Sequence, residues 1–378
     1  MNISSRITII IMLLCTLFAS CENDDQYELS DFVGNDTISI AFQGSTATVG
    51  TVPGFVSVEA SGAHVTIHSN TSKFLVVQLS GATTNGSLLV YSQKKLGIVL
   101  NGVSIQNPQG PAINNQCGKS LYVTLAAGTT STLTDGATYA DAPTNTLGET
   151  IDQKGVLFSE GQIYFRGTGS LSVNGHAKNG IASDDYLTFE HAGQITVDVD
   201  SAGSNGLKAN DGVFISSGAL SVSVAADGAR GIKNDARMEM SGGNVSITTT
   251  GDCKVETVDG VQDTTSCAAI KCDSLFTLSG GTLTLLSKGD GGKGINCSQN
   301  FEQTGGTLSV TTTGSNKNAK PKGVKSDTGV IVSGGTFEST VNKSKACDNA
   351  GQNWPTVIGT PSKTNEDDGD SKHVYITF

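Results

Sequence analysis

Residues 206–224 read GLKANDGVFISSGALSVSV, and residues 231–249, which begin 25 positions later, read GIKNDARMEMSGGNVSITT. Both stretches begin with a glycine followed by an aliphatic residue, and this pair recurs along the chain. It occurs at Gly155-Val156, Gly180-Ile181, Gly206-Leu207, Gly231-Ile232, Gly294-Ile295 and Gly323-Val324, with Ala269-Ile270 in the same place. The steps are 25, 26, 25, 38, 25 and 29 residues, so the step of 38 is one repeat with an insertion between Cys253 and Cys267.

A second glycine follows the first after 12 to 14 residues and precedes alternating apolar positions. These glycines are Gly169, Gly193, Gly218, Gly243, Gly281, Gly306 and Gly335. Two residues later stand Leu171, Ile195, Leu220, Val245, Leu283, Leu308 and Phe337, and four residues later stand Val173, Val197, Val222, Ile247, Leu285, Val310 and Ser339. An alternation with period two predicts β-strands, and the glycines supply the turns between them.

A repeat of about 25 residues with two or three short strands cannot bury its own apolar side chains, so neighbouring repeats must stack. Stacked repeats pair as parallel strands about 4.8 Å apart, which predicts a parallel β-helix. An antiparallel sandwich, the alternative all-β fold, would not keep one template in register over seven copies. We expect a single domain at 37–378 of roughly eleven coils, with degenerate coils in 37–150, regular coils in 151–340 and a C-terminal cap in 341–378.

The first 20 residues are typical of an export signal. Arg6 provides the positive charge, and the apolar run at 7–18 is too short to span a bilayer as a helix. Small residues directly before Cys21 resemble a bacterial lipobox, in which Cys21 would carry the lipid and so attach the protein to the membrane. A plain signal peptide with an incidental cysteine is the alternative.

Residues 21–36 form an acidic tether, because Glu22, Asp24 and Asp25 follow Cys21 at once. Such a patch resembles the outward-export tag of surface lipoproteins in Gram-negative bacteria. We therefore expect an extracytoplasmic outer-membrane lipoprotein exposed at the cell surface, which contacts the membrane only through its lipid.

The charge of the chain restricts its partners. The formal net charge is −11, and removal of residues 1–20 takes away Arg6 and no acidic residue, which leaves −12. A nucleic-acid surface would be basic, so we expect no nucleic-acid partner. The acidity fits calcium or a neutral ligand, whereas an acidic glycan would need a bridging cation or a local basic stripe.

Several strings together resemble a bacterial family of extracellular carbohydrate-binding parallel β-helix proteins, here in a lipoprotein form. They are LNGVSI at 100–105, GLKAND at 206–211, SGG at 241–243, GKGI at 292–295 and PKGVK at 321–325. The resemblance runs from about Thr37 to Thr340, and the order and spacing of the strings carry it. It implies a right-handed β-helix, bound calcium, and binding of cellulose or polygalacturonate without cleavage.

Charged residues recur just after the first glycine of the template. Two residues after it stand Lys208, Lys233, Lys271 and Lys325, and four residues after it stand Asp184, Asp235, Asp273 and Asp327. If the strand continues, both positions point outward, and stacking makes a lysine column beside an aspartate column. Carboxylates on adjacent coils suit a bridging calcium ion, and the lysines suit uronate carboxylates. The alternative is a solvated ladder of Lys–Asp ion pairs.

Loop acids and cysteines leave further alternatives open. Asp200, Asp227 and Asp290 precede the template glycine and form either a second calcium column or turn-stabilising side chains. A disulfide between Cys253 and Cys267 would join the two ends of the insertion.

The leading hypothesis is therefore a non-catalytic, monomeric protein that binds a cellulose- or pectin-like polysaccharide with the help of calcium. A calcium-dependent polysaccharide lyase on the same scaffold is the first alternative. A lyase needs a base, commonly Arg or Lys, and the chain after residue 20 has three arginines, Arg166, Arg230 and Arg237. A structural surface adhesin is the second alternative. Aromatic residues make up only 6% of the chain, so we expect polar and cation contacts to dominate glycan binding.

Overall fold

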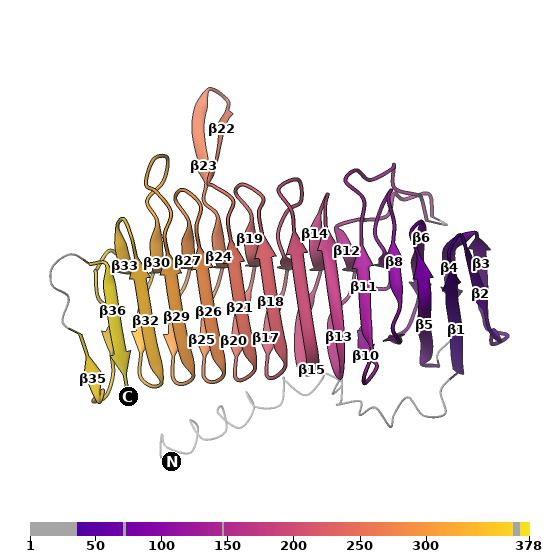
Figure 1. Ribbon diagram of the computed structural model, residues 1–378, viewed down its shortest axis with the longest axis horizontal. Coiled ribbons are helices and arrows are strands. Elements are labelled where there is room, and N and C mark those ends of the chain that lie inside the picture. Colours follow the sequence, from indigo (N-terminus) through magenta and orange to yellow (C-terminus); the bar gives the residue numbers. More distant parts are fainter. Residues whose placement is uncertain (1–35, 71–72, 146, 366–370) are drawn as a thin grey trace, which may run out of the picture. The chain divides into compact units, whose positions relative to one another are not determined.

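The fold is a β-solenoid, seen in a computed structural model that describes residues 36–70, 73–145, 147–365 and 371–378. Asp36–Phe378 forms one compact unit, which begins one residue before the expected start of the domain. The described residues contain strands and no helix, wound into about twelve turns of roughly 25 residues (Figure 1). The predicted parallel β-helix is confirmed, with one turn more than expected. The expected signal peptide, Cys21 and most of the acidic tether lie outside the described residues.

Two large sheets form the walls of the solenoid. Sheet 1 has twelve strands: β3 (Val56–Ser61), β4 (Ala63–Ser69), β6 (Gly86–Ser92), β9 (Ile113–Asn115), β12 (Gly155–Ser159), β14 (Asn179–Ser183), β16 (Leu207–Ala209), β19 (Arg230–Asn234), β24 (Ala268–Cys272), β27 (Lys293–Cys297), β30 (Lys322–Ser326) and β33 (Lys345–Asn349).

Sheet 2 has 22 strands in two parallel ladders, which share the long strands β5 (Leu75–Thr83), β13 (Ile163–Gly175) and β15 (Tyr186–Val199). Ladder A continues through β7 (Leu96–Leu100), β10 (Leu121–Leu125), β17 (Gly212–Ile215), β20 (Arg237–Met240), β25 (Phe276–Leu278), β28 (Phe301–Gln303), β31 (Val330–Val332) and β34 (Thr356–Val357). Ladder B continues through β8 (Ser104–Gln106), β11 (Thr130–Thr134), β18 (Ala219–Val224), β21 (Asn244–Thr249), β26 (Thr282–Ser287), β29 (Thr307–Thr312) and β32 (Thr336–Val341). Each regular coil thus contributes one strand to sheet 1 and one to each ladder.

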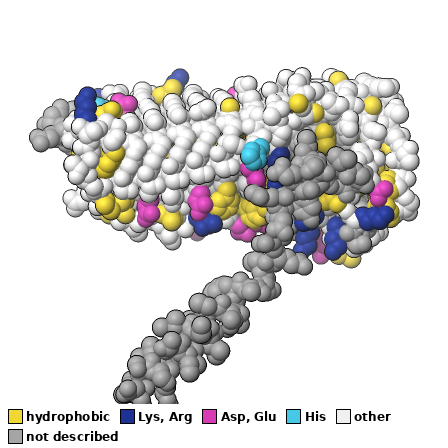
Figure 2. Space-filling model, turned by 90° about the horizontal axis from the view of Figure 1, so that it is seen from below, with side chains coloured by type: hydrophobic (Ala, Val, Ile, Leu, Met, Phe, Trp, Pro, Cys, Tyr) yellow, Lys and Arg dark blue, Asp and Glu magenta, His cyan; other side chains and the backbone are white. Residues whose placement is uncertain are grey.

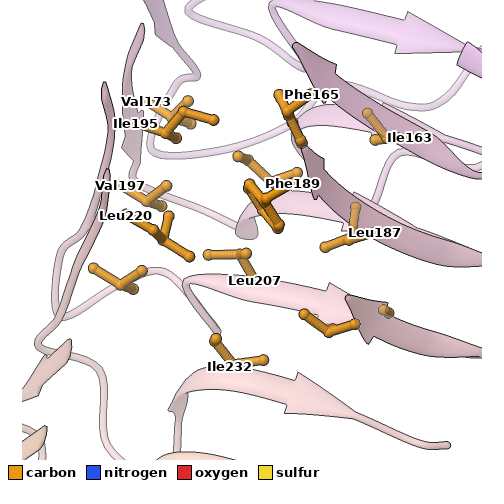
Figure 3. Close-up of a cluster of buried hydrophobic side chains, with 14 of the residues drawn as sticks. Ile163, Phe165, Val173, Leu187, Phe189, Ile195, Val197, Leu207, Leu220 and Ile232 are labelled. Carbon is orange, nitrogen blue, oxygen red and sulfur yellow. The ribbon is translucent and has the colours of Figure 1, made fainter. Parts of the chain in front are cut away.

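The register of ladder B confirms the predicted apolar columns. Leu171, Ile195, Leu220, Val245, Leu283 and Leu308 are successive partners in parallel pairs. These side chains are buried, and Figure 3 shows how Ile195 and Leu220 lie opposite Leu207 and Ile232 of sheet 1 inside the coil. The rings of Phe165 and Phe189 stack in the same interior at 5.0 Å. The core is therefore a set of stacked layers rather than a single cluster around one centre.

The glycine column lies where sheet 1 approaches ladder B. A Cβ atom on Gly231 would come within 2.1 Å of Cγ2 of Ile247 and within 2.6 Å of the carbonyl oxygen of Ala269. Gly180, Gly206, Gly294 and Gly323 are in equivalent contact with the next coil and with ladder B. The glycine column is therefore a requirement of close packing, since a larger residue would push the two walls apart.

One part of the predicted glycine column is wrong. Gly155 pairs with Asn179 and not with Gly180, so the coil that begins at Gly155 is displaced by one residue from the template. Leu157 consequently pairs with Ile181 and Phe158 with Ala182. The displacement follows the long strand-poor segment between β11 and β12, in which Thr144 and Thr150 form one isolated bridge.

Antiparallel strands cap both ends. β1 (Asp36–Gln43) pairs with β2 (Thr46–Val49), and β3 pairs with β4, so two hairpins cover the first coil. At the other end β36 (His373–Thr377) runs antiparallel to β32 and to β35 (Lys363–Thr364). These caps satisfy edges that would otherwise pair with another chain. A third hairpin, β22 (Lys254–Val258) and β23 (Val261–Thr265), is the predicted insertion and projects from the solenoid (Figure 1).

The search for membrane-spanning segments, which covered the described residues, found no helix long and apolar enough to cross a bilayer.

The packing of the glycine column predicts a large effect of a single methyl group. Gly231→Ala should lower the free energy of unfolding by about 1–3 kcal/mol, because the new Cβ overpacks the contact with Ile247. Gly54→Ala is the matched control, since a Cβ there meets no atom within 4 Å, and it should change stability by less than about 0.5 kcal/mol. Chemical denaturation of both variants checks this, and equal stabilities would contradict the close-packed column.

Candidate functional site

Charge is distributed unevenly over the solenoid. On ladder B one outward column consists of Ser221, Ser246, Thr284 and Ser309. Figure 2, seen from below, shows a broad band of surface with almost no charged side chains and charges gathered along one long edge. Sheet 1, in contrast, carries the lysine and aspartate positions of the template on its outer side, so it is the candidate site.

The register of sheet 1 brings the four predicted lysines together. Lys208 pairs with Lys233 and Lys233 with Lys271. Asn296 then stands between Lys271 and Lys325. All four lysines lie in one outward column, as the sequence predicted.

The four predicted aspartates directly follow strands of sheet 1, namely β14, β19, β24 and β30. Each donates its backbone N–H to a carbonyl group of the preceding coil, with N···O distances of 3.1 Å for Asp184, 3.1 Å for Asp235, 2.9 Å for Asp273 and 3.2 Å for Asp327. Asp235 and Asp273 belong to adjacent coils, because the hairpin β22–β23 extends away between them. The aspartate column is therefore present beside the lysine column.

Three of these aspartates are bound by lysines. Lys208 and Lys233 contact Asp235, Lys271 contacts Asp273, and Lys325 contacts Asp327. Burial alone would raise the pKa of Asp235, but the hydrogen bond from Lys208 and the charges of Lys208 and Lys233 hold it below its ordinary value. Over this half of the sheet the structure contains the Lys–Asp ladder that was the alternative interpretation.

Asp184 has different neighbours, one of which the sequence reasoning missed. Because β12 is displaced by one residue, Glu160 and not Ser159 takes the place beside Asp184 in the column: Ser159 pairs with Ser183 and its side chain is buried. Asp152 reaches the same place from the loop before β12. Carboxylate oxygens of Asp152, Glu160 and Asp184 all lie within 4.8 Å of one another. A template shifted by one position at Gly155 would have identified Glu160, but nothing in the repeat points to Asp152.

The loop that carries Asp152 is held by side-chain amides of sheet 1. The backbone oxygen of Asp152 accepts hydrogen bonds from Nδ2 of Asn114 at 3.0 Å and from Nε2 of Gln116 at 3.1 Å. Lys154 places its Nζ 2.6 Å from Asp152 and 2.5 Å from Asp184. The three carboxylates therefore have one partially compensating cation between them.

The pKa of Glu160 is raised in this crowded, acidic place. Burial, followed by the charges of Asp184 and Asp152, raises the pKa of Glu160 to about 7. Like charges so close together favour a protonated carboxyl unless a cation offsets them. Oxygen ligands from several carboxylates at this spacing suit a hard divalent cation such as Ca²⁺. The three residues thus have the donor set for a calcium ion.

A groove of about 380 Å³ lies beside the carboxylates. Tyr91, Gln116 and Glu149 line it together with Asp152 and Glu160. The ring of Tyr91 stacks on His68 with centroids 4.8 Å apart and is partly exposed. The groove therefore offers an aromatic ring, amides and acidic oxygens to one ligand.

Three further tyrosines contact one another on ladder A. Tyr122 and Tyr164 stack at 4.9 Å on ladder A, and Tyr186 meets Tyr164 edge-on at 5.8 Å. Arg166 lies over Tyr122, with its guanidinium carbon 4.9 Å from the ring centroid. Arg237 bonds Glu239 at 2.9 Å on the same ladder. Two of the three arginines considered as lyase bases thus belong to a different surface from the lysine and aspartate columns.

The loop acids accept hydrogen bonds from backbone N–H groups. Oδ1 of Asp200 accepts one from Ala202, two residues later, at 2.8 Å, which corresponds to the turn-stabilising alternative. Asp227 and Asp290 instead bind the loop of the next coil: Oδ1 of Asp227 accepts from the N–H of Asp252 at 2.8 Å, and Asp290 accepts from the N–H groups of Lys317 and Asn318 at 2.7 and 2.9 Å.

Cys253 and Cys267 lie at the base of the hairpin as buried free thiols, so the predicted disulfide is not formed in this structure. Sγ of Cys253 is 3.4 Å from Oδ2 of Asp290, and Sγ of Cys267 is 3.8 Å from the backbone oxygen of Asp290. Burial is the main cause that raises the pKa of both thiols to about 11. A hydrogen bond to Asp290 adds to the effect at Cys253, and the charge of Cys253 adds to it at Cys267.

Comparisons with known proteins agree with this architecture. A family model described as "Carbohydrate-binding domain-containing protein" matches residues 61–231 and 228–316. Among solved structures, the chain is similar to a polysaccharide lyase-like protein from C. thermocellum, determined as a gadolinium derivative. The two share 24% identity and a TM-score of 0.54 over 71% of this chain and 96% of the other, which shows a shared fold. A search of curated proteins found no match.

The raised pKa of Glu160 predicts a pH-dependent loss of stability without metal. A carboxyl whose pKa is raised in the folded state contributes fully to stability when the pH is below its ordinary pKa. This contribution is lost as the pH rises through the folded-state pKa of about 7. With EDTA present, Glu160→Gln should therefore raise Tm relative to the parent protein at pH 8 and have a smaller effect at pH 5. Glu59→Gln, at an exposed position of β3, is the control and should have no effect at either pH. The same Tm difference at both pH values would show that Glu160 is not the titrating group.

Proposed function

Since the chain belongs to the family of carbohydrate-binding domain-containing proteins, we propose that it binds an extracellular polysaccharide, without cleaving it, through the outer surface of sheet 1. The observation that carries this proposal is the parallel register of sheet 1, which collects lysines, aspartates and the acidic groove on one surface. A regular polymer that runs along the solenoid would meet these groups one after another.

We propose that calcium binds at the carboxylate cluster. Asp152, Glu160 and Asp184 would hold the ion, with backbone or glycan oxygens as further ligands. A bound divalent cation would remove the repulsion that raises the pKa of Glu160, and it would offer an open coordination position to an acidic sugar. Asp235, Asp273 and Asp327 are weaker candidates, because each has at least one lysine of its own, whereas Lys154 is shared by the cluster of three carboxylates.

The lysine beside the cluster argues against a lyase. Burial alone would lower the pKa of Lys154, but its hydrogen bonds to Asp152 and Asp184 and their charges raise it above the ordinary value. An amine held in its protonated form is a poor general base. Arg166 and Arg237 stand on ladder A, away from the carboxylates of sheet 1. Together these contacts favour binding over elimination chemistry.

We further propose that the solenoid is held at the cell surface by a lipid on Cys21. The lipobox-like residues before Cys21 and the acidic residues after it support this location. An anchored binder would retain polysaccharide at the outer membrane, and no second chain is needed for the sheet 1 surface to be complete.

Calcium removal should weaken glycan binding in the parent protein but not in a cluster variant. We expect EDTA to lower the affinity for polygalacturonate about tenfold or more, since charge-assisted contacts are worth roughly 1.5–3 kcal/mol each. Asp152→Asn with Asp184→Asn should bind calcium weakly and show no further loss with EDTA. Asp235→Asn with Asp273→Asn is the matched pair and should retain calcium binding. Calorimetry with calcium and then with glycan measures both steps, and loss of calcium binding only in the second pair would move the ion to those aspartates.

The lipid anchor has its own test. Cys21→Ser should abolish acylation and release the protein in soluble form, because the thiol is the acceptor of the lipid. Membrane fractionation and mass spectrometry of the mature protein measure the two effects. A variant that still partitions into membranes would contradict the anchor while leaving glycan binding unaffected.

A further inference from the structure

A second cationic column crosses sheet 1 at the starts of its strands. Arg230 pairs with Ala268, and Ala268 pairs with Lys293. The column continues from Lys293 through Lys322 to Lys345. The repeat did not predict this column, because its members precede the template glycine or its equivalent by one position, and Arg230 was considered only as a possible lyase base.

The later members of this column have an acidic partner. Nζ of Lys322 lies 2.8 Å from Oδ2 of Asp348, and Nζ of Lys345 lies 3.6 Å from Oδ1 of the same residue. Lys345 also donates to the backbone oxygen of Gly351 at 2.7 Å. The two cations at this end of the column are thus compensated within the protein.

Arg230 and Lys293 are not compensated in this way. Lys293 is only 9% exposed, and its Nζ donates to the hydroxyl of Ser266 at the base of the hairpin. Arg230 donates from Nη1 to the backbone oxygen of Gly228 at 2.6 Å, while its Nε is buried without a hydrogen-bond partner. Within the described part of the chain, neither cation forms an ion pair with a carboxylate. A buried cation without a counter-charge is costly and calls for a bound anion or water.

The acids and thiols around these cations do not supply the missing charge. Asp273 is near Arg230 but is bound by Lys271 and the hydroxyl of Ser298. Cys267 is also close, and burial raises the pKa of its thiol to about 11, so it is uncharged at neutral pH. Burial, then the charge of Lys325, lowers the pKa of Lys293 to about 8. Lys293 is therefore still mostly protonated at neutral pH, although its surroundings oppose the charge.

The residue between the two cations is a buried alanine. Ala268 separates Arg230 from Lys293 by two rungs, or about 10 Å between their Cα atoms, and is only 1% exposed. The charge of Arg230 nevertheless acts on Lys293 and helps to lower its pKa. Arg230 and Ser266 are partly exposed, which gives an approach from solvent beside the hairpin.

We propose that Arg230 and Lys293 form an oxyanion-binding niche at the base of the hairpin β22–β23, which receives a carboxylate or sulfate group of an acidic polysaccharide. The inference rests on the proposed function in taking a polysaccharide as the carrier of the anion. The guanidinium group would bind two oxygens of the anion through Nε and a terminal nitrogen, and Lys293 would bind from the opposite side. Ser266 would then exchange its contact with Lys293 for one with the ligand.

Three variants separate this niche from general electrostatic attraction. Lys293→Met removes one of the proposed ligands and should lower the affinity for polygalacturonate about tenfold. Arg230→Gln removes the guanidinium group, the other proposed ligand, and should have a similar effect. Lys288→Met removes a charge from an exposed position of the same region and is the control, with little expected effect. Calorimetry on the full folded protein measures all three, and circular dichroism checks that each variant is folded.

A chemical footprint gives a second measurement that loss of stability would not mimic. Acetylation of Lys293, followed by mass spectrometry, should slow in the presence of inorganic sulfate and of galacturonate oligosaccharides, whereas neutral cello-oligosaccharides should give no protection. Protection by the uronate alone would identify a carboxylate niche, and protection by sulfate and a sulfated glycan alone would identify a sulfate niche.

The outcomes distinguish the niche from the proposed function. Unchanged affinity for polygalacturonate in both Lys293→Met and Arg230→Gln, with binding by the parent protein, would overturn the niche and leave polysaccharide binding in place. Binding of neutral polysaccharides only would do the same. Protection of Lys293 by sulfate in a protein that binds no polysaccharide would support the niche and overturn the proposed function.

Discussion

The parallel hydrogen-bonding register between successive coils is the constraint on which the rest of this structure depends. Each residue of a coil has one partner in the next coil, at a rung of about 4.8 Å. A residue type that recurs at one template position therefore becomes a continuous column, as Leu220, Val245 and Leu283 do in the core. The same rule places Gly206 and Gly231 where two walls meet, and it leaves no freedom to vary one coil without regard to its neighbours.

Charged columns obey that register as well, and they create an electrostatic problem that hydrophobic columns do not have. Like charges one rung apart repel, so each column needs compensation from a neighbouring one. At Asp235 and Asp273 lysines provide it. At Glu160 and Asp184 a single lysine faces three carboxylates, and the pKa of Glu160 rises. Arg230 and Lys293 present the reverse case, with cations that no described carboxylate contacts. An external ion would therefore offset the most unbalanced charge at these two places, the carboxylate cluster and the pair of cations.

The repeat made the fold predictable from sequence, since a 25-residue template with alternating apolar positions fits few architectures. It also predicted the lysine and aspartate columns, because equal template positions must stack.

The repeat failed as a guide where one coil is displaced from the template. The one-residue displacement at Gly155 concealed Glu160, and the pairing of Gly155 with Asn179 could be seen only in the structure. Asp152 lies in an irregular loop with no period, and the pairing of each lysine with its aspartate depends on side-chain rotamers that spacing alone does not determine. The column of Arg230 and Lys293 precedes the template glycine by one position, where the residue type changes from coil to coil, so no repeat in the sequence marks it.

The two uncompensated places lie on one surface in an order that suits a polymer. Asp184 follows β14 and Ala268 begins β24, three coils later, so about 14 Å of sheet separates the carboxylate cluster from the cationic niche. Between them stand Lys208 and Lys233, whose charges are shared with Asp235. An acidic polysaccharide that lies along the axis would meet a calcium ion at one end and an arginine and a lysine at the other. A neutral polymer would offer hydroxyl groups but no charge to either place. Under the proposed function, the distribution of charge along sheet 1 therefore favours an acidic ligand over a neutral one, although the chain as a whole is acidic.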